Sequence, residues 1–444
     1  MSEKDNKVGL VGFTILTTVS MTDGIIMLPT MVAQVGSISI YSWIITTISV
    51  MILAFAFSRC GMYNRKTGGL GGYAEYVFGK SGNFLANYSY AIALLVANVG
   101  IAISVVAYTS AFLDITLPPL QAAFWASVVL VLTTVANFFG TKKTVQIGFV
   151  AMMLKVVPAC IMCVLGLWYF DPAIFKAAWN PHGYTIPASI SAANSFTLWA
   201  FLGFESACSN MDRVENPTRN VPIAVILATA FIGIFSIAYT TVIQGIVPND
   251  QLAVSNGPFG LAFATMFGPE VGHFIMALMI MGCAGALIAW QFTLGELLRS
   301  GGHEGYFPPS FDKVNKRGVP VHAMVVMMAI QIVMILFTVS PTLVKQFDVL
   351  VQLATVDNLV PYIMAMAALD VMQKSCGHND RTTRVAAIFG ALYSLYAIYS
   401  CGADAVMYGS LAVFLGFLFY GLFAGRWVVP FKPGQTNTDW IEKQ

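Results

Sequence analysis

The stretch Ser20-Met21-Thr22-Asp23-Gly24-Ile25-Ile26-Met27-Leu28-Pro29 interrupts the first long apolar segment, about residues 8–35. Its flanks have the composition of a membrane helix, whereas its centre holds a Ser, a Thr, an Asp and a Gly. A carboxylate near the bilayer midplane costs about 2.5–3.5 kcal/mol on insertion scales, and Gly24 tolerates a break in the backbone. The groups freed by a break must face a protein cavity rather than lipid. The stretch predicts either a broken helix that lines a substrate site, as in transporters, or a kink whose Asp pairs with a neighbouring helix.

The composition is that of a helical protein that crosses the membrane many times. Of the 444 residues, 57% are hydrophobic and 10% are charged, whereas soluble domains carry about 25% charged residues. The apolar stretches are long enough for helices to cross roughly 30 Å of hydrocarbon, and they lack the short alternating pattern of a barrel. The seven Cys are scattered without a C-x-x-C pair, so we expect them to pack as small apolar residues.

We expect twelve membrane-spanning helices. Their approximate ranges are 8–35, 38–58, 82–112, 122–139, 146–170, 186–208, 221–247, 270–298, 320–339, 347–370, 383–401 and 405–428. With the N-terminus inside, 20 of the 23 Lys and Arg residues fall in the inner segments, and only Lys176 and Lys345 fall in the outer ones. Because positive charge stays on the cytoplasmic side, we predict a multi-pass membrane protein with both termini in the cytoplasm.

A second candidate break lies in the sixth span, at Trp199-Ala200-Phe201-Leu202-Gly203-Phe204-Glu205-Ser206. Here too a Gly stands beside an intramembrane carboxylate. The two interrupted spans are five apart, which indicates a five-plus-five inverted repeat with the substrate between the breaks. The predicted fold is an all-α membrane protein with one transporter domain, residues 1–444. Residues 8–170 and 186–370 would form the repeats, and residues 383–428 two additional helices.

Two connecting segments have a distinctive composition. The glycine-rich segment 68–75 lacks the Lys-Ser/Thr ending of a phosphate-binding loop, and no strand precedes it. We therefore expect a flexible re-entrant or hinge segment there. The polar segment 214–222 contains Pro217 and Pro222 and is predicted to cap the sixth span and to open the seventh.

Several motifs resemble the amino acid–polyamine–organocation superfamily. They are the two breaks, Gly71-Gly72-Tyr73-Ala74-Glu75-Tyr76, Asn216-Pro217 and Trp290-Gln291-Phe292-Thr293. Within the superfamily the chain is most similar to the bacterial basic amino acid/polyamine antiporters, nearly from end to end. The resemblance implies exchange of an amino acid for its decarboxylated amine across the inner (plasma) membrane by alternating access, in the manner of putrescine–ornithine antiport.

The first break departs from the pattern of these antiporters. They usually read Gly-Ser-Gly-Ile, where backbone N–H groups and the Ser receive the substrate α-carboxylate. Here the segment 22–25 places Asp23 where the small polar residue belongs, and an Asp repels a carboxylate. Alternative functions are histidine/histamine, agmatine/putrescine or lysine/cadaverine exchange, and proton-coupled polyamine uptake. Outside transport, an amine-binding membrane sensor stays open.

Four ionisable residues lie within predicted spans: Asp23, Lys155, Glu205 and Asp357. Each is a functional-site hypothesis by default. Three acids and one base leave negative charge that a substrate with two ammonium groups would balance, so we assign the three acids to substrate binding. For Glu205, proton-coupled gating and a structural carboxyl are the alternatives. By resemblance, Lys155 takes the place of a bound sodium ion and pairs with Asp23 or Asp357, or it forms a purely structural pair.

Aromatic and polar side chains complete the predicted site. An ammonium over a Trp face gains roughly 0.5–2 kcal/mol, so we expect Trp199, Trp290 and Tyr90 around the substrate, although packing would also explain any one of them. The resemblance adds further positions: Ser20, Gly24 and Asn98 facing the substrate, and Cys60, Glu75 and Tyr420 in the gate or vestibule.

No constellation of catalytic residues is present. The five His lie in loops or at span ends, without an H-E-x-x-H motif or a paired ligand set. We therefore expect neither enzymatic activity nor a metal or other cofactor. The expected partners are a small cationic amine or amino acid and the lipid bilayer, but no nucleic acid, and a homodimer is an open alternative.

Overall fold

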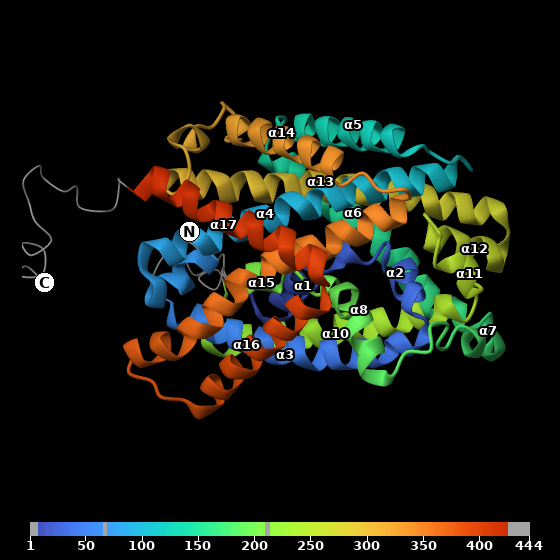
Figure 1. Ribbon diagram of the computed structural model, residues 1–444, viewed down its shortest axis with the longest axis horizontal. Helices are drawn as coiled ribbons and strands as arrows, with labels where there is room; N and C mark the ends of the chain where they lie inside the picture. Colours follow the sequence, from blue (N-terminus) through green and yellow to red (C-terminus); the bar gives the residue numbers. More distant parts are fainter. Residues whose placement is uncertain (1–7, 65–68, 209–213, 425–444) are drawn as a thin grey trace, which may run out of the picture.

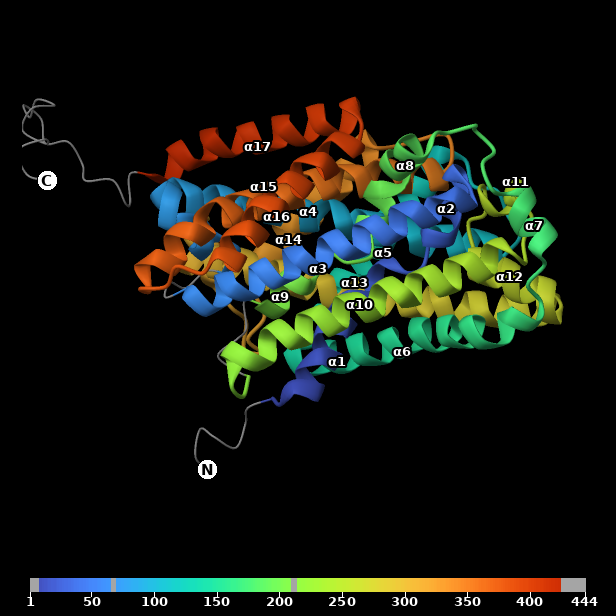
Figure 2. The same ribbon diagram turned by 90° about the horizontal axis from the view of Figure 1, so that it is seen from below.

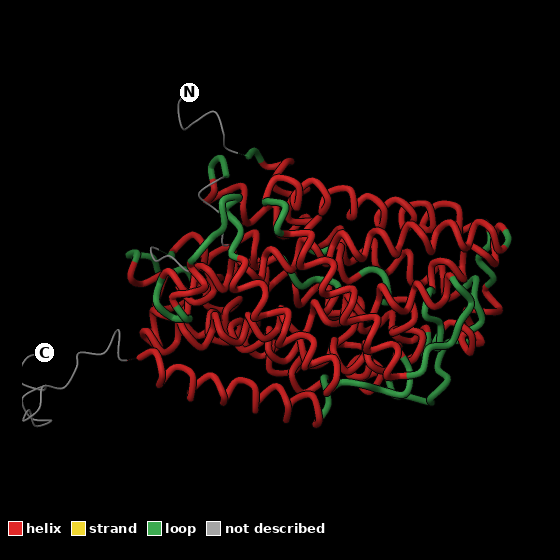
Figure 3. Tube along the Cα trace, turned by 90° about the horizontal axis from the view of Figure 1, so that it is seen from above, coloured by secondary structure: helices red, strands yellow, loops and turns green. Residues whose placement is uncertain are grey.

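The computed structural model describes residues 8–64, 69–208 and 214–424. In this part of the chain the secondary structure is helical, apart from an isolated parallel bridge between Val8 and Val214 (Figure 3). Most of the helices run side by side along the long axis of the molecule (Figures 1 and 2). Eight of them are long and apolar enough to cross a membrane. The predicted all-α membrane fold is confirmed.

Each of the twelve predicted spans corresponds to one helix or to an interrupted pair, α1–α2 and α8–α9. In chain order the elements are α1 (Leu10–Ser20), η2 (Thr22–Gly24), α2 (Leu28–Val35), η3 (Ser37–Ser39), α3 (Ile40–Tyr63), α4 (Gly69–Phe112), α5 (Pro119–Asn137), α6 (Thr141–Leu165), η4 (Gly166–Trp168), α7 (Pro172–Ala177), α8 (Ile186–Trp199), α9 (Phe204–Cys208), α10 (Pro217–Gln244), α11 (Asn249–Leu252), α12 (Pro258–Phe267), α13 (Pro269–His303), η6 (Pro309–Asp312), α14 (Val321–Phe337), α15 (Leu343–Ser375), α16 (Arg381–Ser400) and α17 (Ala403–Ala424).

The first predicted break is confirmed. α1 ends at Ser20, a single 3₁₀ turn follows, and α2 begins at Leu28. A broken helix exposes backbone groups that need partners inside the protein. The hydroxyl of Tyr108, on α4, donates to the carbonyl of Ile26 at 2.9 Å. A neighbouring helix therefore supplies a partner that the interrupted helix lacks.

The second predicted break, between α8 and α9, is also confirmed, and it touches the first. Gly203 has φ +119°, and a Cβ at this position would lie 2.3 Å from the carbonyl oxygen of Ser20. Only glycine combines that backbone conformation with so close an approach. The hydroxyl of Ser20 donates to the carbonyl of Gly203 at 3.2 Å. The two breaks thus contact each other inside the protein.

The glycine-rich segment, predicted as a flexible re-entrant or hinge segment, is helical from Gly69 onward. It forms the first part of α4, and the helix bends at Gly79, where φ is 62°. A Cβ at Gly71 would lie 2.4 Å or less from the side chains of Asn83 and Asn87. The glycines here therefore allow two helical segments to pack closely, which composition alone does not distinguish from a loop.

The polar segment 214–222 opens α10 as predicted. Asn216 has φ +43°, and Pro217 takes the first turn of the helix, where its missing N–H costs nothing. The backbone N–H of Glu215 donates to the carbonyl of Val8 at 3.0 Å, which ties this segment to the start of α1. Residues 209–213, which join α9 to this segment, lie outside the described residues, so its predicted cap on the sixth span stays a prediction.

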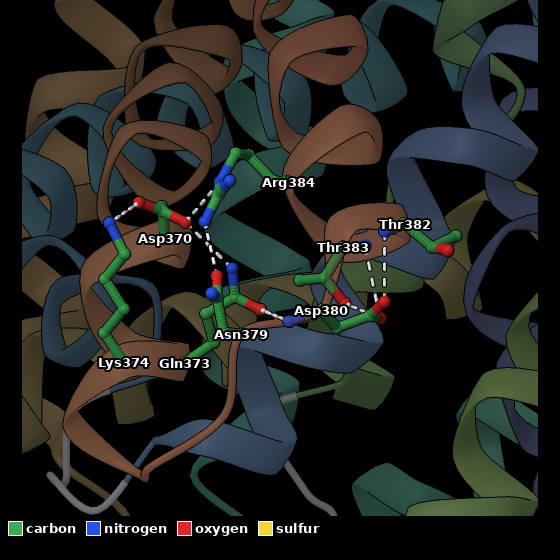
Figure 4. Close-up of polar contacts among 8 residues, drawn as sticks. All are labelled: Asp370, Gln373, Lys374, Asn379, Asp380, Thr382, Thr383 and Arg384. Atoms are coloured by element: carbon green, nitrogen blue, oxygen red, sulfur yellow. Dashed lines mark hydrogen bonds and ion pairs between the residues drawn. The ribbon is translucent and has the colours of Figure 1, made fainter.

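The connection between α15 and α16 is held by two carboxylates (Figure 4). Asp370 pairs with Arg384 at 2.9 Å. Asp380 accepts hydrogen bonds from the backbone N–H groups of Thr382 and Thr383 at 3.0 and 3.3 Å and so caps α16. The hydrogen bond from the Thr383 hydroxyl, at 2.7 Å, is the main reason why the pKa of Asp380 is lowered. This junction joins the predicted second repeat to the two additional helices.

Candidate functional site

A cavity lies where the two breaks meet. It offers about 50 Å³ to the centres of water-sized molecules, which is room for a few waters, since one needs about 10–15 Å³. The described residues that line it belong to η2, α4, the α8–α9 break, α13 and α15. They are Gly24, Tyr90, Ala93, Leu94, Ala97, Ile101, Trp199, Leu202, Gly203, Glu205, Trp290, Ala354 and Asn358.

Glu205 is the acidic group among the described lining residues, and three donors hold it. Its exposed fraction is 2%. Its carboxylate accepts hydrogen bonds from the hydroxyls of Tyr90 at 3.0 Å and Tyr362 at 2.6 Å, and from the backbone N–H of Gly203 at 2.9 Å. A hydrogen bond to a charged group contributes about 1.5–3 kcal/mol. Because the donors come from α4, α15 and the break, the carboxylate ties these elements together beside the cavity.

Two tryptophans form much of the remaining wall. Trp199 ends α8 and packs so closely on η2 that a Cβ at Gly24 would lie 2.9 Å from its Cδ1 atom. The ring of Phe347 supports it from α15, edge-on, with centroids 6.4 Å apart. Trp290 lines the cavity from α13. An aromatic cage with one carboxylate suits an ammonium group, because ring faces and a carboxylate both attract a cation.

The family model described as amino acid permease matches residues 9–439. The chain belongs to the amino acid permease family. This membership confirms the resemblance to the amino acid–polyamine–organocation superfamily. In this family the named relatives are transporters rather than enzymes.

Three relatives are similar in sequence to the permease over most of its length. It is 50% identical to the putrescine transporter PotE of Escherichia coli, over 97% of this chain and 99% of the relative. It is 48% identical to the putrescine transporter PotE of Haemophilus influenzae, over 95% of this chain and 98% of the relative. Its identity to the cadaverine/lysine antiporter of Escherichia coli is 27%, over 88% of this chain and 89% of the relative.

The cavity of the permease brings together five of the predicted substrate-binding residues: Gly24, Tyr90, Trp199, Glu205 and Trp290. Their contact with a substrate stays a prediction. Ser20 lies at the junction of the two breaks, where its hydroxyl bonds backbone carbonyls. The side chain of Asp23 lies outside the described part of the structure, so its predicted role stays open.

Asn98 does not line the cavity. Its side chain donates to Gln291 at 3.4 Å, and Gln291 in turn donates to Gln331 at 2.8 Å, so it belongs to a buried row of amides across α4, α13 and α14. Ala97 faces the cavity, and each next residue of an α-helix is turned by about 100° around the axis. The side chain of Asn98 therefore faces away from the cavity.

The same angular step separates Asp357 from the cavity. Asn358 lines the cavity, whereas the carboxylate of Asp357 lies toward α17, where a Cβ at Gly409 would be 3.5 Å from its Oδ1 atom. Neither of its oxygens has a hydrogen-bond partner among the described residues. Asp357 is therefore not the ion-pair partner of Lys155 in this structure.

Lys155 is fully buried on α6. It packs against α13 so closely that a Cβ at Gly282 would lie 2.6 Å from its Cγ atom. The turn η2, which contains Asp23, contacts α6. Pairing of Lys155 with Asp23 in place of a sodium ion therefore stays a prediction.

The three residues predicted for gating do not line the cavity. Cys60 is buried, with its thiol 3.8 Å from a backbone carbonyl of α15. Glu75 pairs with Lys80 at 3.0 Å near the bend in α4. Tyr420 packs from α17 on Phe84 of α4, with ring centroids 5.4 Å apart. Their gating roles stay predictions.

Asn358, Tyr362 and the apolar wall of α4 were not predicted from the sequence. On α15, Ala354, Asn358 and Tyr362 repeat every four residues and so share one face. A similar helical spacing from Tyr90 marks the wall of α4: Leu94, Ala97 and Ile101. Tyr362 carried no separate signal, because it is one of 17 tyrosines.

Proposed function

We propose that this permease is a secondary active antiporter that exchanges a diamine for a basic amino acid, with putrescine and ornithine as the pair. The observation that carries the proposal is Glu205, a buried carboxylate beside a cavity between two broken helices. The names of the relatives at 50% and 48% identity support putrescine as one substrate. The antiporter at 27% identity supports exchange with an amino acid.

The residues of the cavity divide the recognition of such a substrate. Glu205 binds one ammonium group of the substrate. Trp199 and Trp290 cover that charge and the substrate's hydrocarbon chain. An amino acid also carries an α-carboxylate, which the backbone N–H groups freed in the first break receive. Asp23 opposes that carboxylate and favours a second ammonium group, so the first break discriminates between the two substrates.

Exchange follows from the hydrogen bonds of Glu205. In the empty protein Tyr90 and Tyr362 occupy the carboxylate and hold α4 and α15 against the break. A substrate ammonium competes for the same oxygens and displaces these hydrogen bonds. The loaded protein therefore switches between its outward-open and inward-open conformations more readily than the empty one. Binding energy is then spent on the conformational change, and each passage in one direction requires a return passage with the counter-substrate.

We place the protein in the inner membrane with both termini in the cytoplasm, because the basic residues gather in alternate connecting segments. Residues 8–170 and 186–370 then act as the two repeats, whose broken helices move against the surrounding bundle. A second candidate function, proton-coupled polyamine uptake, is favoured by Asp23 in the first break.

The test is uptake of radiolabelled putrescine into proteoliposomes loaded with ornithine, histidine, agmatine or nothing. Antiport predicts rapid uptake at equal pH only with an internal counter-substrate. Uptake under a proton gradient without any exchange at equal pH would favour the second candidate, and binding without uptake would leave the membrane sensor.

Matched variants separate the role of Glu205 from a general loss of charge. Glu205→Gln should abolish exchange, because the amide cannot balance the ammonium charge. Glu296→Gln removes an acid that pairs with Arg299 at 2.9 Å outside the cavity, and it should exchange normally. Equal activity in both variants would contradict the proposed role of Glu205.

A further inference from the structure

Asp357 is a buried carboxyl without a hydrogen-bond partner among the described residues. Its exposed fraction is 0%, and neither oxygen is hydrogen-bonded within the described residues. Its surroundings are small and apolar. Gly409 of α17 lies against it, and the neighbouring Val356 packs with Cys401 and Ala405.

An ionised carboxylate is not stable in these surroundings. Moving an isolated ion into a low-dielectric interior costs tens of kcal/mol by Born solvation, and a carboxyl in such a place stays neutral instead. Glu205 differs because three donors face it. The conformation described here therefore holds a proton on Asp357.

Few titratable groups face this carboxyl. Tyr88 of α4 interacts with it electrostatically. Cys401, directly after α16, shares a buried cluster with Val356, and α17 presents Gly409 and Ala405, which do not titrate. No hydrogen bond joins Asp357 to the described residues of α2, α3 and α8, which also pack on α15. Its charge state thus depends on access to water rather than on a fixed partner.

α15 connects this carboxyl to the cavity. Asn358 lines the cavity, and Tyr362 donates to Glu205. Pro361 lies inside the helix and has no N–H to donate to the carbonyl of Asp357, four residues earlier, so the helix is weakened at this point. A movement of α15 that separates Tyr362 from Glu205 therefore also changes the contact of Asp357 with α17.

We propose that Asp357 is a proton-binding site that couples a proton gradient to transport through α15. In the enclosed conformation the site is a carboxylic acid. When α15 moves away from α17, water reaches the group, the O–H bond breaks, and the proton leaves to water with the carboxylate left behind. Reprotonation from the other side restores the enclosed form. The inference rests on the proposed transport function and adds a coupling ion to it.

The experiment compares two activities of the full-length protein in proteoliposomes that contain a pH-sensitive dye. The first is putrescine self-exchange at equal pH, and the second is putrescine uptake into otherwise empty vesicles under a proton gradient. Asp357→Asn keeps the shape of a protonated Asp, and Asp357→Leu suits the apolar surroundings if the amide does not fold. Asp348→Asn is the matched control, because Asp348 is on the same helix and accepts a hydrogen bond from Gln352 at 2.6 Å.

We expect both Asp357 variants to keep self-exchange. Their gradient-driven uptake and the accompanying dye signal should fall about tenfold or more, within the usual range of coupling between sites. Asp348→Asn should behave as the wild type in both assays. Gradient-driven uptake that persists in the Asp357 variants would overturn the inference.

Two results with the wild type would also overturn it, and they are distinguishable. If the wild type self-exchanges but shows no gradient-driven uptake, the coupling role of Asp357 fails and antiport stands. If the wild type neither exchanges nor takes up putrescine, the proposed transport function fails, and the inference fails with it.

Discussion

The hydrogen bond from Tyr362 to Glu205 is the shortest of the three that hold the carboxylate, at 2.6 Å. Tyr362→Phe removes the hydroxyl and keeps the ring, which packs on Phe57 with centroids 4.8 Å apart. Tyr90 and the N–H of Gly203 still bind Glu205, so the variant should fold. The lost bond is worth about 1.5–3 kcal/mol. The ratio of open to enclosed protein should therefore rise about 10- to 150-fold, since about 1.4 kcal/mol is a factor of ten.

A native thiol reports this ratio. Cys208 follows Glu205 on α9 and is fully buried, so a water-soluble alkylating reagent reaches it only when the helices around Glu205 separate. The labelling rate of the Cys208 peptide, followed by mass spectrometry in membrane vesicles, should rise about 10- to 150-fold in Tyr362→Phe. Cys376, which is half-buried at the end of α15, should label at its wild-type rate.

A matched variant excludes a general effect of removing a buried hydroxyl. Tyr393 lies on α16, and its hydroxyl donates to Asn194 at 3.3 Å away from the cavity. Tyr393→Phe should leave the labelling of Cys208 unchanged. If Tyr362→Phe also labels Cys208 at the wild-type rate, the bond to Glu205 does not hold the site closed, and the mechanism proposed for exchange is wrong.

Three further predictions concern stability, measured as thermal unfolding in detergent. Gly203→Ala should destabilise the protein by at least the roughly 1–3 kcal/mol of backbone strain, because its Cβ would also meet a carbonyl 2.3 Å away; an unchanged melting temperature would contradict the contact between the breaks. Gln291→Leu should cost about 1–3 kcal/mol by leaving Gln331 unpaired, and adding Gln331→Leu should recover part of that loss rather than increase it. Asp380→Ala should cost about 1 kcal/mol at neutral pH through the lost helix cap. Because hydrogen bonds, above all from Thr383, hold the pKa of folded Asp380 below its unfolded value, the cap contributes fully above the unfolded pKa. Its contribution disappears as the pH falls through the folded value, so wild type and variant should converge in strong acid; a constant difference would refute the charge-dependent part.

The breaks and the spans were predictable because the bilayer allows few arrangements. A lipid-facing helix admits neither a run of polar residues nor free backbone groups, so Ser20–Pro29 and Trp199–Ser206 stood out from their flanks. The polar residues around Gly24 and Glu205 marked the breaks in the sequence. Helix ends were predicted within a few residues for most spans, since apolar length follows membrane thickness.

The faces of the helices were not predictable in the same way. Asn98 and Asp357 were chosen for their chemistry, yet each lies one residue from a position that lines the cavity. A step of one residue turns a side chain by about 100°, and residue type does not reveal which face meets the neighbouring helices. The helical packing of the segment after Gly69 was not predictable for a related reason, because glycine serves close helix packing as well as flexibility.

The two buried acids differ in the backbone groups that surround them. Glu205 stands at the start of α9, where the break leaves the N–H of Gly203 free to donate to it, and two tyrosines complete the set. Asp357 stands within α15, where backbone N–H groups are engaged inside the helix. Pro361 leaves the backbone carbonyl of Asp357 without its helical N–H donor. A carbonyl can accept the O–H of a carboxylic acid, but it cannot stabilise a carboxylate. An anion that attracts substrate is therefore favoured at the break, and a protonated acid is favoured within the continuous helix. The same backbone chemistry thus separates Glu205, which we propose binds the amine, from Asp357, which we propose carries the proton.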